Sequence, residues 1–160
     1  MVSWLLDKID INISVQDDIW SLEQYQSIIS EAIYTVLDHL NLMDEFKSSS
    51  ISIVLTNDNF IQSLNKQYRF IDKPTNVLSF PQERNLDFGE DCLGDIILSF
   101  ERIKEEGDQQ NKEFQSHLIH LVIHGLLHVL GYDHETNDQA IEMEAIEIAV
   151  LGKLNIENPY

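Results

Sequence analysis

The segment His124-Gly-Leu-Leu-His128-Val-Leu-Gly131-Tyr-Asp-His134 carries three imidazoles, the second four positions after the first and the third six positions later. Residues four apart lie on one face of an α-helix, so His124 and His128 can point at one ion if the segment is helical. Gly131 suits the left-handed backbone at which helices end, and a reversal there lets His134 approach the other two rings. The spacing therefore predicts a three-histidine metal site with a fourth coordination position open.

An apolar run around these histidines predicts a buried helix over residues 114–130. Its apolar side chains are Leu118, Leu121, Val122, Ile123, Leu126, Leu127, Val129 and Leu130. Because they surround the helix almost completely, the pattern is typical of a helix inside a core. One histidine there would more often be a core residue than a ligand, but three must each find a partner, and neutral imidazole is a common metal ligand. His117 and His120, upstream on the same face, are expected beside the ligands or on the substrate side, and a structural role is equally open.

Composition indicates one globular domain over residues 1–160, in which 43% of the residues are hydrophobic. No apolar stretch approaches the roughly 20 residues that span a bilayer. Asp7 interrupts the short apolar segment Trp4–Leu6, so we expect no secretory signal. The single cysteine, Cys92, cannot form an internal disulfide and fits a reducing compartment. These features together predict a cytoplasmic protein that has no membrane partner.

The formal net charge of −18 disfavours nucleic acid as a partner at long range. Basic residues are nevertheless concentrated between positions 66 and 84. This stretch contains the four cations Lys66, Arg69, Lys73 and Arg84 and only two acidic residues, Asp72 and Glu83. Local charge dominates at close range because salt screens charges over about 8 to 10 Å. Tyr68, Phe70 and Phe80 are interleaved with these cations and could stack on bases, or could simply belong to the core.

The remaining sequence predicts short strands and helices in mixed order. Strands are expected at 9–15, 50–55, 77–80 and 92–99, helices at 21–43, 57–68 and 136–152, an exposed connection at 82–91, and a polar helical or irregular stretch at 99–113. Gly94 predicts a bulge or a close approach, and Gly152 the end of the last helix. The fold class is therefore α+β, a small mixed sheet of about four strands packed with about five helices around the ligand-bearing helix.

The ligand spacing coincides with that of metzincin proteases, whose motif is His-Glu-x-x-His-x-x-Gly-x-x-His. Gly125 stands where those proteases carry their glutamate general base, and Met143 falls inside an expected helix rather than a Met-turn. A metallopeptidase is therefore the weaker alternative. Zinc at such a site lowers the pKa of coordinated water to about 7, which favours hydrolysis, although imidazole also suits nickel, copper and iron.

Three segments together resemble the YbeY endoribonucleases, metal-dependent bacterial proteins associated with ribosomal RNA maturation and ribosome quality control. They are the histidine segment 120–134, Leu64-Asn-Lys-Gln-Tyr-Arg-Phe-Ile-Asp-Lys-Pro-Thr-Asn-Val-Leu-Ser-Phe-Pro81, and Leu93-Gly-Asp-Ile-Ile-Leu-Ser99. Asn76 stands where the family often has aspartate, which changes one charge.

The resemblance implies a zinc-dependent endoribonuclease that prefers single strands, with the ion on His124, His128 and His134 and a functional arginine at Arg69. An arginine fork can bind the nonbridging oxygens of a phosphate bidentately. Taken alone, however, Arg69 would more often be an ordinary surface arginine paired with Asp72. The attacking group, water or the RNA's own 2′-hydroxyl, stays open.

Further residues are expected to assist at this site. Asp133 joins His117 and His120 as a candidate beside the ligands, and the candidates for contact with RNA are Lys66, Tyr68, Lys73, Ser79 and Phe80. The expected partners are ribosomal RNA and the small ribosomal subunit or a basic ribosomal protein. The alternative from another class is a non-catalytic ribosome-assembly factor whose metal is structural and whose acidic surface binds basic proteins. His39 is given no role.

Overall fold

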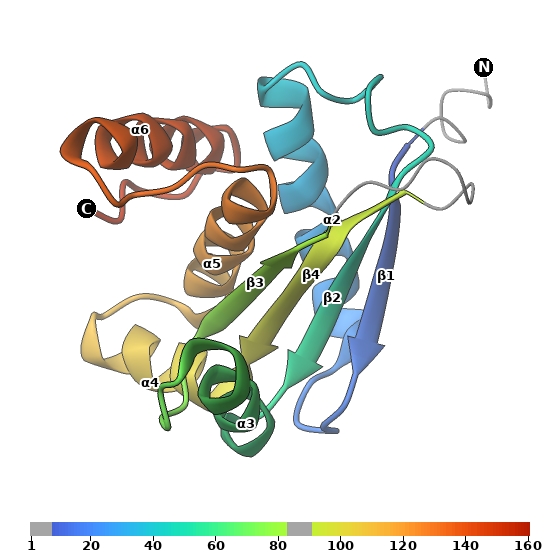
Figure 1. The fold of residues 1–160 in the computed structure, drawn as a ribbon. Helices are drawn as coiled ribbons and strands as arrows, with labels where there is room; N and C mark the ends of the chain where they lie inside the picture. Colours follow the sequence, from blue (N-terminus) through green and yellow to red (C-terminus); the bar gives the residue numbers. More distant parts are fainter. Residues whose placement is uncertain (1–7, 83–90) are drawn as a thin grey trace.

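The computed structural model, which describes residues 8–82 and 91–160, is built around a four-stranded mixed sheet (Figure 1). The strands lie in the order β1 (Asp10–Val15), β2 (Ser50–Thr56), β4 (Cys92–Ser99) and β3 (Val77–Pro81). The first three run parallel, and β3 pairs antiparallel with β4 at one edge. Trp4–Leu6 and most of the connection predicted at 82–91, including Glu83 and Arg84, lie outside the described residues.

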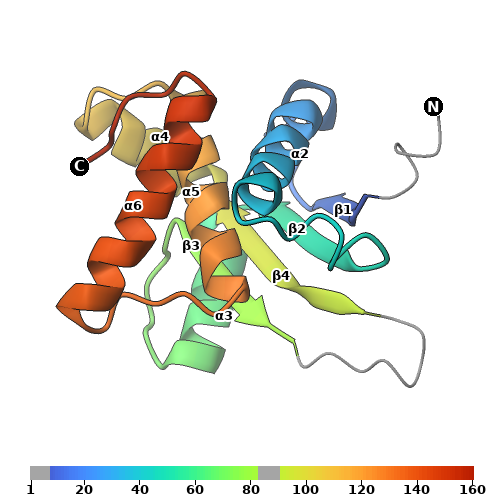
Figure 2. The same ribbon diagram turned by 90° about the horizontal axis from the view of Figure 1, so that it is seen from above.

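Helices cover both faces of the sheet. α2 (Leu22–His39) and α5 (Phe114–Val129) lie on one face, and α3 (Asp58–Arg69) lies on the other (Figures 1 and 2). α4 (Phe100–Gln109) follows β4 directly, and α6 (Asn137–Lys153) packs against α5 and α2. This confirms the predicted α+β class with a mixed sheet, and the stretch after Ser99 is helical rather than irregular. Across residues 8–82 and 91–160, none of the helices has the length and apolarity to span a bilayer.

The alternation of side chains along the strands separates two apolar clusters. On β2, Ile53 and Leu55 point into the main core under α2 and α5, whereas Val54 packs with the smaller cluster under α3. Gly94 approaches β3 closely, because a Cβ there would lie 2.5 Å from the carbonyl oxygen of Phe80. The register between β2 and β4 shifts beside it. The close approach predicted at Gly94 is therefore confirmed.

α5 is buried on almost every side, as its apolar pattern predicts, by the sheet, α2, α4 and α6. After it, Gly131 adopts a φ of +101°, a backbone that other residue types rarely adopt. The N–H of Tyr132 then donates to the carbonyl of Leu127 at 2.9 Å, which closes the helix and turns the chain back. This local geometry returns the following residues to the end of α5.

The predicted end of the last helix is wrong. α6 continues through Gly152 to Lys153, and the left-handed residue beyond it is Asn155, with a φ of 61°. Asparagine tolerates this backbone because its short polar side chain can hydrogen-bond locally. The inner face of α6 carries a carboxylate, since Glu147 is 1% exposed whereas the apolar Ile141 is 67% exposed. The periodicity of apolar residues in the sequence does not reveal a buried carboxylate.

Gly125 on α5 faces β3 and β4 so closely that a larger residue must displace its neighbours. A Cβ there would lie 3.0 Å from Cγ2 of Ile96, 3.1 Å from Oγ of Ser79 and 3.3 Å from Cγ2 of Val77. At Gly152, also helical, nothing lies within 4 Å of the corresponding position.

We predict that Gly125→Ala has a free energy of unfolding about 1–3 kcal/mol below that of Gly152→Ala, because overpacking is added at only one site. Both variants gain similar helix propensity, so that contribution cancels in the comparison. Urea denaturation measures the difference. Equal stability of the two variants would show that β3 and β4 do not constrain this position.

Candidate metal centre

His124 and His128 on α5 and His134 in the following loop each direct one nitrogen to a common point. Their candidate ligand atoms all lie within 4.8 Å of one another, and the two Nε2 atoms of His124 and His128 are 3.1 Å apart. Nitrogens bound to one tetrahedral zinc at 2.0–2.1 Å would be roughly 3.3 Å apart, so this donor set fits a single ion. His134 is exposed, which makes the cluster accessible from solvent on that side.

A buried carboxylate fixes the orientation of His124. Oε1 of Glu147, on α6, lies 2.6 Å from Nδ1 of His124. Burial alone raises the pKa of Glu147, but hydrogen bonds from His120, His124 and Tyr160 outweigh burial and lower it to about 2. An ionised carboxylate can only accept, so Nδ1 of His124 carries the proton and Nε2 keeps the lone pair that a metal requires.

The electrostatic surroundings of His128 also favour the neutral imidazole, which is the form that binds a metal. Burial and the neighbouring His124 and His134 lower the pKa of His128, against the opposing effect of Asp133 and a hydrogen bond to the backbone of Tyr132. A lowered pKa keeps this imidazole neutral at neutral pH, as metal binding requires. Oδ1 of Asp133 also accepts from the backbone N–H of His134 at 2.7 Å, which orders the turn that carries the third histidine.

His120 lies one turn before His124 and shares its carboxylate partner. Its Nε2 is 3.5 Å from Oε2 of Glu147 and 3.4 Å from the hydroxyl oxygen of Tyr160. The Tyr160 hydroxyl donates to the same Oε2 in turn. Burial, followed by the hydrogen bond to Glu147 and the negative charge of that carboxylate, raises the pKa of Tyr160, so its hydroxyl stays protonated as a donor. His120 is therefore part of the hydrogen-bond network around His124 and lies outside the three-histidine cluster.

His117 pairs with a different carboxylate, that of Glu106 on α4. Nε2 of His117 lies 2.8 Å from Oε1 of Glu106, and Nδ2 of Asn76 donates to the same oxygen at 2.9 Å. Asn76, noted for its departure from the family pattern, thus helps to hold this carboxylate.

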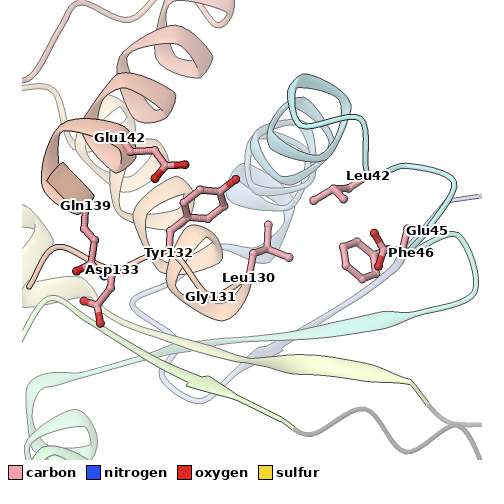
Figure 3. Close-up of a pocket in the computed structure, with 9 residues that line it drawn as sticks. All are labelled: Leu42, Glu45, Phe46, Leu130, Gly131, Tyr132, Asp133, Gln139 and Glu142. Atoms are coloured by element: carbon pink, nitrogen blue, oxygen red, sulfur yellow. The ribbon is translucent and has the colours of Figure 1, made fainter.

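A cavity of about 340 Å³ lies beside the cluster, with His117, His120 and His124 among its lining residues. A larger hollow of about 490 Å³ lies behind the His134 turn, where Figure 3 shows Tyr132 and Leu130 facing Leu42 and Phe46. Its lining, within the described residues, contains no imidazole of the cluster. The smaller cavity is therefore the one that adjoins the candidate ligands.

Arg69, the last residue of α3, reaches the edge strand β3. Its Nη2 donates to the carbonyl of Ser79 at 3.0 Å, and its guanidinium lies 5.7 Å from the centre of the Phe80 ring. Asp72, the alternative partner considered from sequence, lies 3.8 Å from Nζ of Lys66 instead. The hydroxyl of Ser79 donates to the carbonyl of Gly125 at 2.9 Å, so one residue of β3 connects Arg69 to the helix that carries His124.

The structure separates the five residues proposed for RNA contact into two environments. Lys66, Tyr68 and Lys73 are exposed on α3 or just after it. Phe80 is half-buried and packs against Tyr68 with ring centres 5.3 Å apart. Ser79 is buried, and its side chain lies in the contact between β3 and α5.

Sequence reasoning missed Glu147, Glu106 and Tyr160. A signal existed for Glu147, because it occupies a helical position between the apolar residues Met143 and Val150. Glu106 lies in a strongly polar helix and Tyr160 in an irregular tail, so no local pattern distinguishes either residue. Their positions depend on contacts between elements that are distant in sequence.

The three-imidazole cluster defines the chain as a protein with a candidate metal site, and comparisons with known proteins specify its class. The model of the family described as endoribonuclease YbeY matches residues 10–155. A protein of Bartonella bacilliformis named endoribonuclease YbeY is 41% identical over 156 residues, which cover 95% of this chain and 97% of that protein. One of the same name from Colwellia psychrerythraea is 46% identical over 138 residues, 86% of each chain.

The chain therefore belongs to the YbeY endoribonuclease family, a family of metal-dependent RNA hydrolases. A solution structure of a Thermotoga maritima protein shares the fold, with a TM-score of 0.58, 24% identity and 91% of each chain covered.

The contact between Glu147 and His124 leads to a prediction about metal affinity. We expect Glu147→Gln to weaken metal binding about 10- to 100-fold, because an amide cannot hold the protonated Nδ1 as an ionised carboxylate does. Competition with a chromophoric chelator measures the affinity. Glu142→Gln, at an exposed position on the same helix, is the control. Equal metal affinities in the two variants would show that Glu147 does not contribute to metal binding.

The contact between Glu106 and His117 leads to a prediction about acid stability. Burial raises the pKa of Glu106, but hydrogen bonds from His117 and Asn76 outweigh it, and the pKa lies below the ordinary value of 4.5. The ionised form therefore stabilises the fold above pH 4.5, and this contribution disappears as the pH falls through the lower folded-state value. Denaturation should show Glu106→Gln less stable than wild type near neutral pH, with the difference vanishing in acid. Glu31→Gln, on exposed α2 surface, should show no such trend.

Proposed function

We propose that this chain is a zinc-dependent endoribonuclease that prefers single-stranded RNA and acts in ribosomal RNA maturation and ribosome quality control. The observation that carries the proposal is the cluster of His124, His128 and His134, which is accessible to solvent and adjoins a cavity large enough for part of a nucleotide. All 160 residues would form one catalytic domain.

The three histidines would hold the ion, for which imidazole nitrogens in a tetrahedral set suit zinc well. When bound, the ion polarises a phosphoryl oxygen and lowers the pKa of coordinated water. Glu147 keeps Nε2 of His124 available for binding, and Asp133 orders the turn at His134.

Arg69 would stabilise the negative charge that develops on the nonbridging oxygens of the scissile phosphate. Its partners are the carbonyl of Ser79 and the ring of Phe80, neither of which neutralises a guanidinium. The charge therefore remains available to a phosphate. His117 and His120 line the adjoining cavity and would orient the RNA or move protons there.

Substrate RNA would approach across α3, where Lys66, Lys73 and Tyr68 are exposed, with Phe80 beside them. The carbonyl of Ser79 accepts a hydrogen bond from Arg69 and so positions the guanidinium. The net charge of −18 elsewhere favours a basic partner, and we propose a basic protein of the small ribosomal subunit. The cytoplasm is the compartment that this assignment requires.

The peptidase alternative is disfavoured by packing as well as by sequence. The position of the metzincin glutamate is Gly125, where even a Cβ would lie 3.0 Å from Ile96. A glutamate base there would require β3 and β4 to move away.

The proposed role of Arg69 predicts a large kinetic effect with little change in metal binding. We expect Arg69→Ala to reduce cleavage of a single-stranded RNA about 100-fold or more, with unchanged metal content. Lys104→Ala, which removes an exposed cation on α4, should retain full activity.

The same assay identifies the attacking group and tests the non-catalytic alternative. A 2′,3′-cyclic phosphate end would assign attack to the 2′-hydroxyl, whereas a 3′-hydroxyl with a 5′-phosphate would assign it to water. Cleavage that survives in both Arg69→Ala and His124→Ala would come from a contaminant and would overturn the proposed function. Loss of folding on chelation, with no cleavage by wild type, would favour a structural ion.

A further inference from the structure

Phe70, immediately after α3, combines two features that are unfavourable within a folded chain. Its backbone is left-handed, with φ 61° and ψ 29°, in the position at a helix end that glycine or asparagine usually occupies. Its side chain is 91% exposed. A bulky residue pays a steric penalty in this backbone, and the exposed ring gains almost no packing against the described residues in return.

The loop that carries Phe70 is nevertheless firmly held. The N–H groups of Phe70 and Ile71 both donate to the carbonyl of Asn65, and Nδ2 of Asn65 donates to the carbonyl of Lys73 at 2.9 Å. Nε2 of Gln62 donates to Oδ1 of Asp72 at 3.0 Å. Asn65 is itself buried, with 5% exposure. The ring is therefore presented to solvent by an ordered loop.

The surface around this ring combines cations with exposed apolar and aromatic groups, and Asp72, beside Lys66, is the acidic residue among them. Three of the ten lysines and arginines, Lys66, Arg69 and Lys73, lie within four residues of Phe70 in sequence. Tyr68 is 54% exposed and Ile71 is 50% exposed. A flat apolar ring among cations is the combination that binds single-stranded nucleic acid, because bases stack and phosphates pair with the charges.

We propose that Phe70 is a stacking site for an unpaired nucleobase of the RNA, with Lys66 and Lys73 on the flanking phosphates. The inference rests on the proposed function and deepens it, because stacking on Phe70 requires a base that is not enclosed in a duplex. Arg69 precedes Phe70 directly, so a strand stacked here would bring a neighbouring phosphate toward the guanidinium. An acidic protein segment would use the same cations but would have no base to stack.

The test measures affinity and cleavage separately with the metal-loaded full chain. Affinity comes from fluorescence anisotropy with a 2′-O-methyl single strand, and a strand of equal length without bases serves as the second ligand. Phe70→Ala should weaken binding of the base-containing strand about 5- to 100-fold, and should leave binding of the abasic strand unchanged. Phe70→Trp should retain affinity, and Ile19→Ala, an apolar position 46% exposed on another surface, should change neither ligand's binding.

A second variant separates stacking from folding. Phe70→Asn suits the left-handed backbone, so we expect its thermal midpoint to rise by about 2–4 °C while affinity falls as in Phe70→Ala. Cleavage of unmodified RNA at subsaturating protein should fall in both variants, in step with the lost affinity.

Unchanged affinity in Phe70→Ala, or an equal loss for the abasic strand, would overturn the stacking proposal even if the wild type cleaves RNA. Absence of cleavage by wild type would instead overturn the proposed function, and the anisotropy comparison would still decide whether a base stacks on Phe70.

Discussion

The burial of α5 is the constraint on which the rest of this structure depends. A helix enclosed by a sheet and three other helices cannot carry imidazoles unless each finds a polar partner. Glu147 from α6 supplies this partner for His120 and His124. Glu106 from α4 supplies it for His117. Packing α4 and α6 against α5 and orienting its histidines are therefore a single requirement, so the candidate metal centre is part of the core that holds the domain together.

The edge strand β3 lies between the candidate metal centre and the basic surface at α3, and it contacts both. On one side Ser79 contacts α5 next to His124, and on the other its carbonyl receives Arg69 from α3. The metal site and its ionised carboxylates thus lie on one face of the sheet, whereas cations and exposed aromatic rings lie on the other. This arrangement explains how a chain with a net charge of −18 can present a local surface suited to a polyanion.

Sequence alone was sufficient wherever the determining information is local. The spacing of His124, His128 and His134, with Gly131 between them, predicted a cluster that the structure forms, because helix periodicity and one turn set the geometry. The α+β class followed in the same way. Glu147 and Glu106 could not be found by periodicity, because their importance comes from pairing across helices. The sequence marked Gly125 only as the position that lacks the glutamate of metzincin proteases. The structure shows that close packing against β3 and β4 leaves little room for a side chain there.

The central claim is that three particular imidazoles share one ion, and titration of the metal-free chain with cobalt(II) tests it most directly. Wild type should bind one equivalent with the visible absorption of a tetrahedral nitrogen-ligated site. Alanine at His124, His128 or His134 should abolish that spectrum, whereas His39→Ala, on α2, should retain it in full. A tetrahedral spectrum with wild-type affinity after loss of any one of the three would contradict the account.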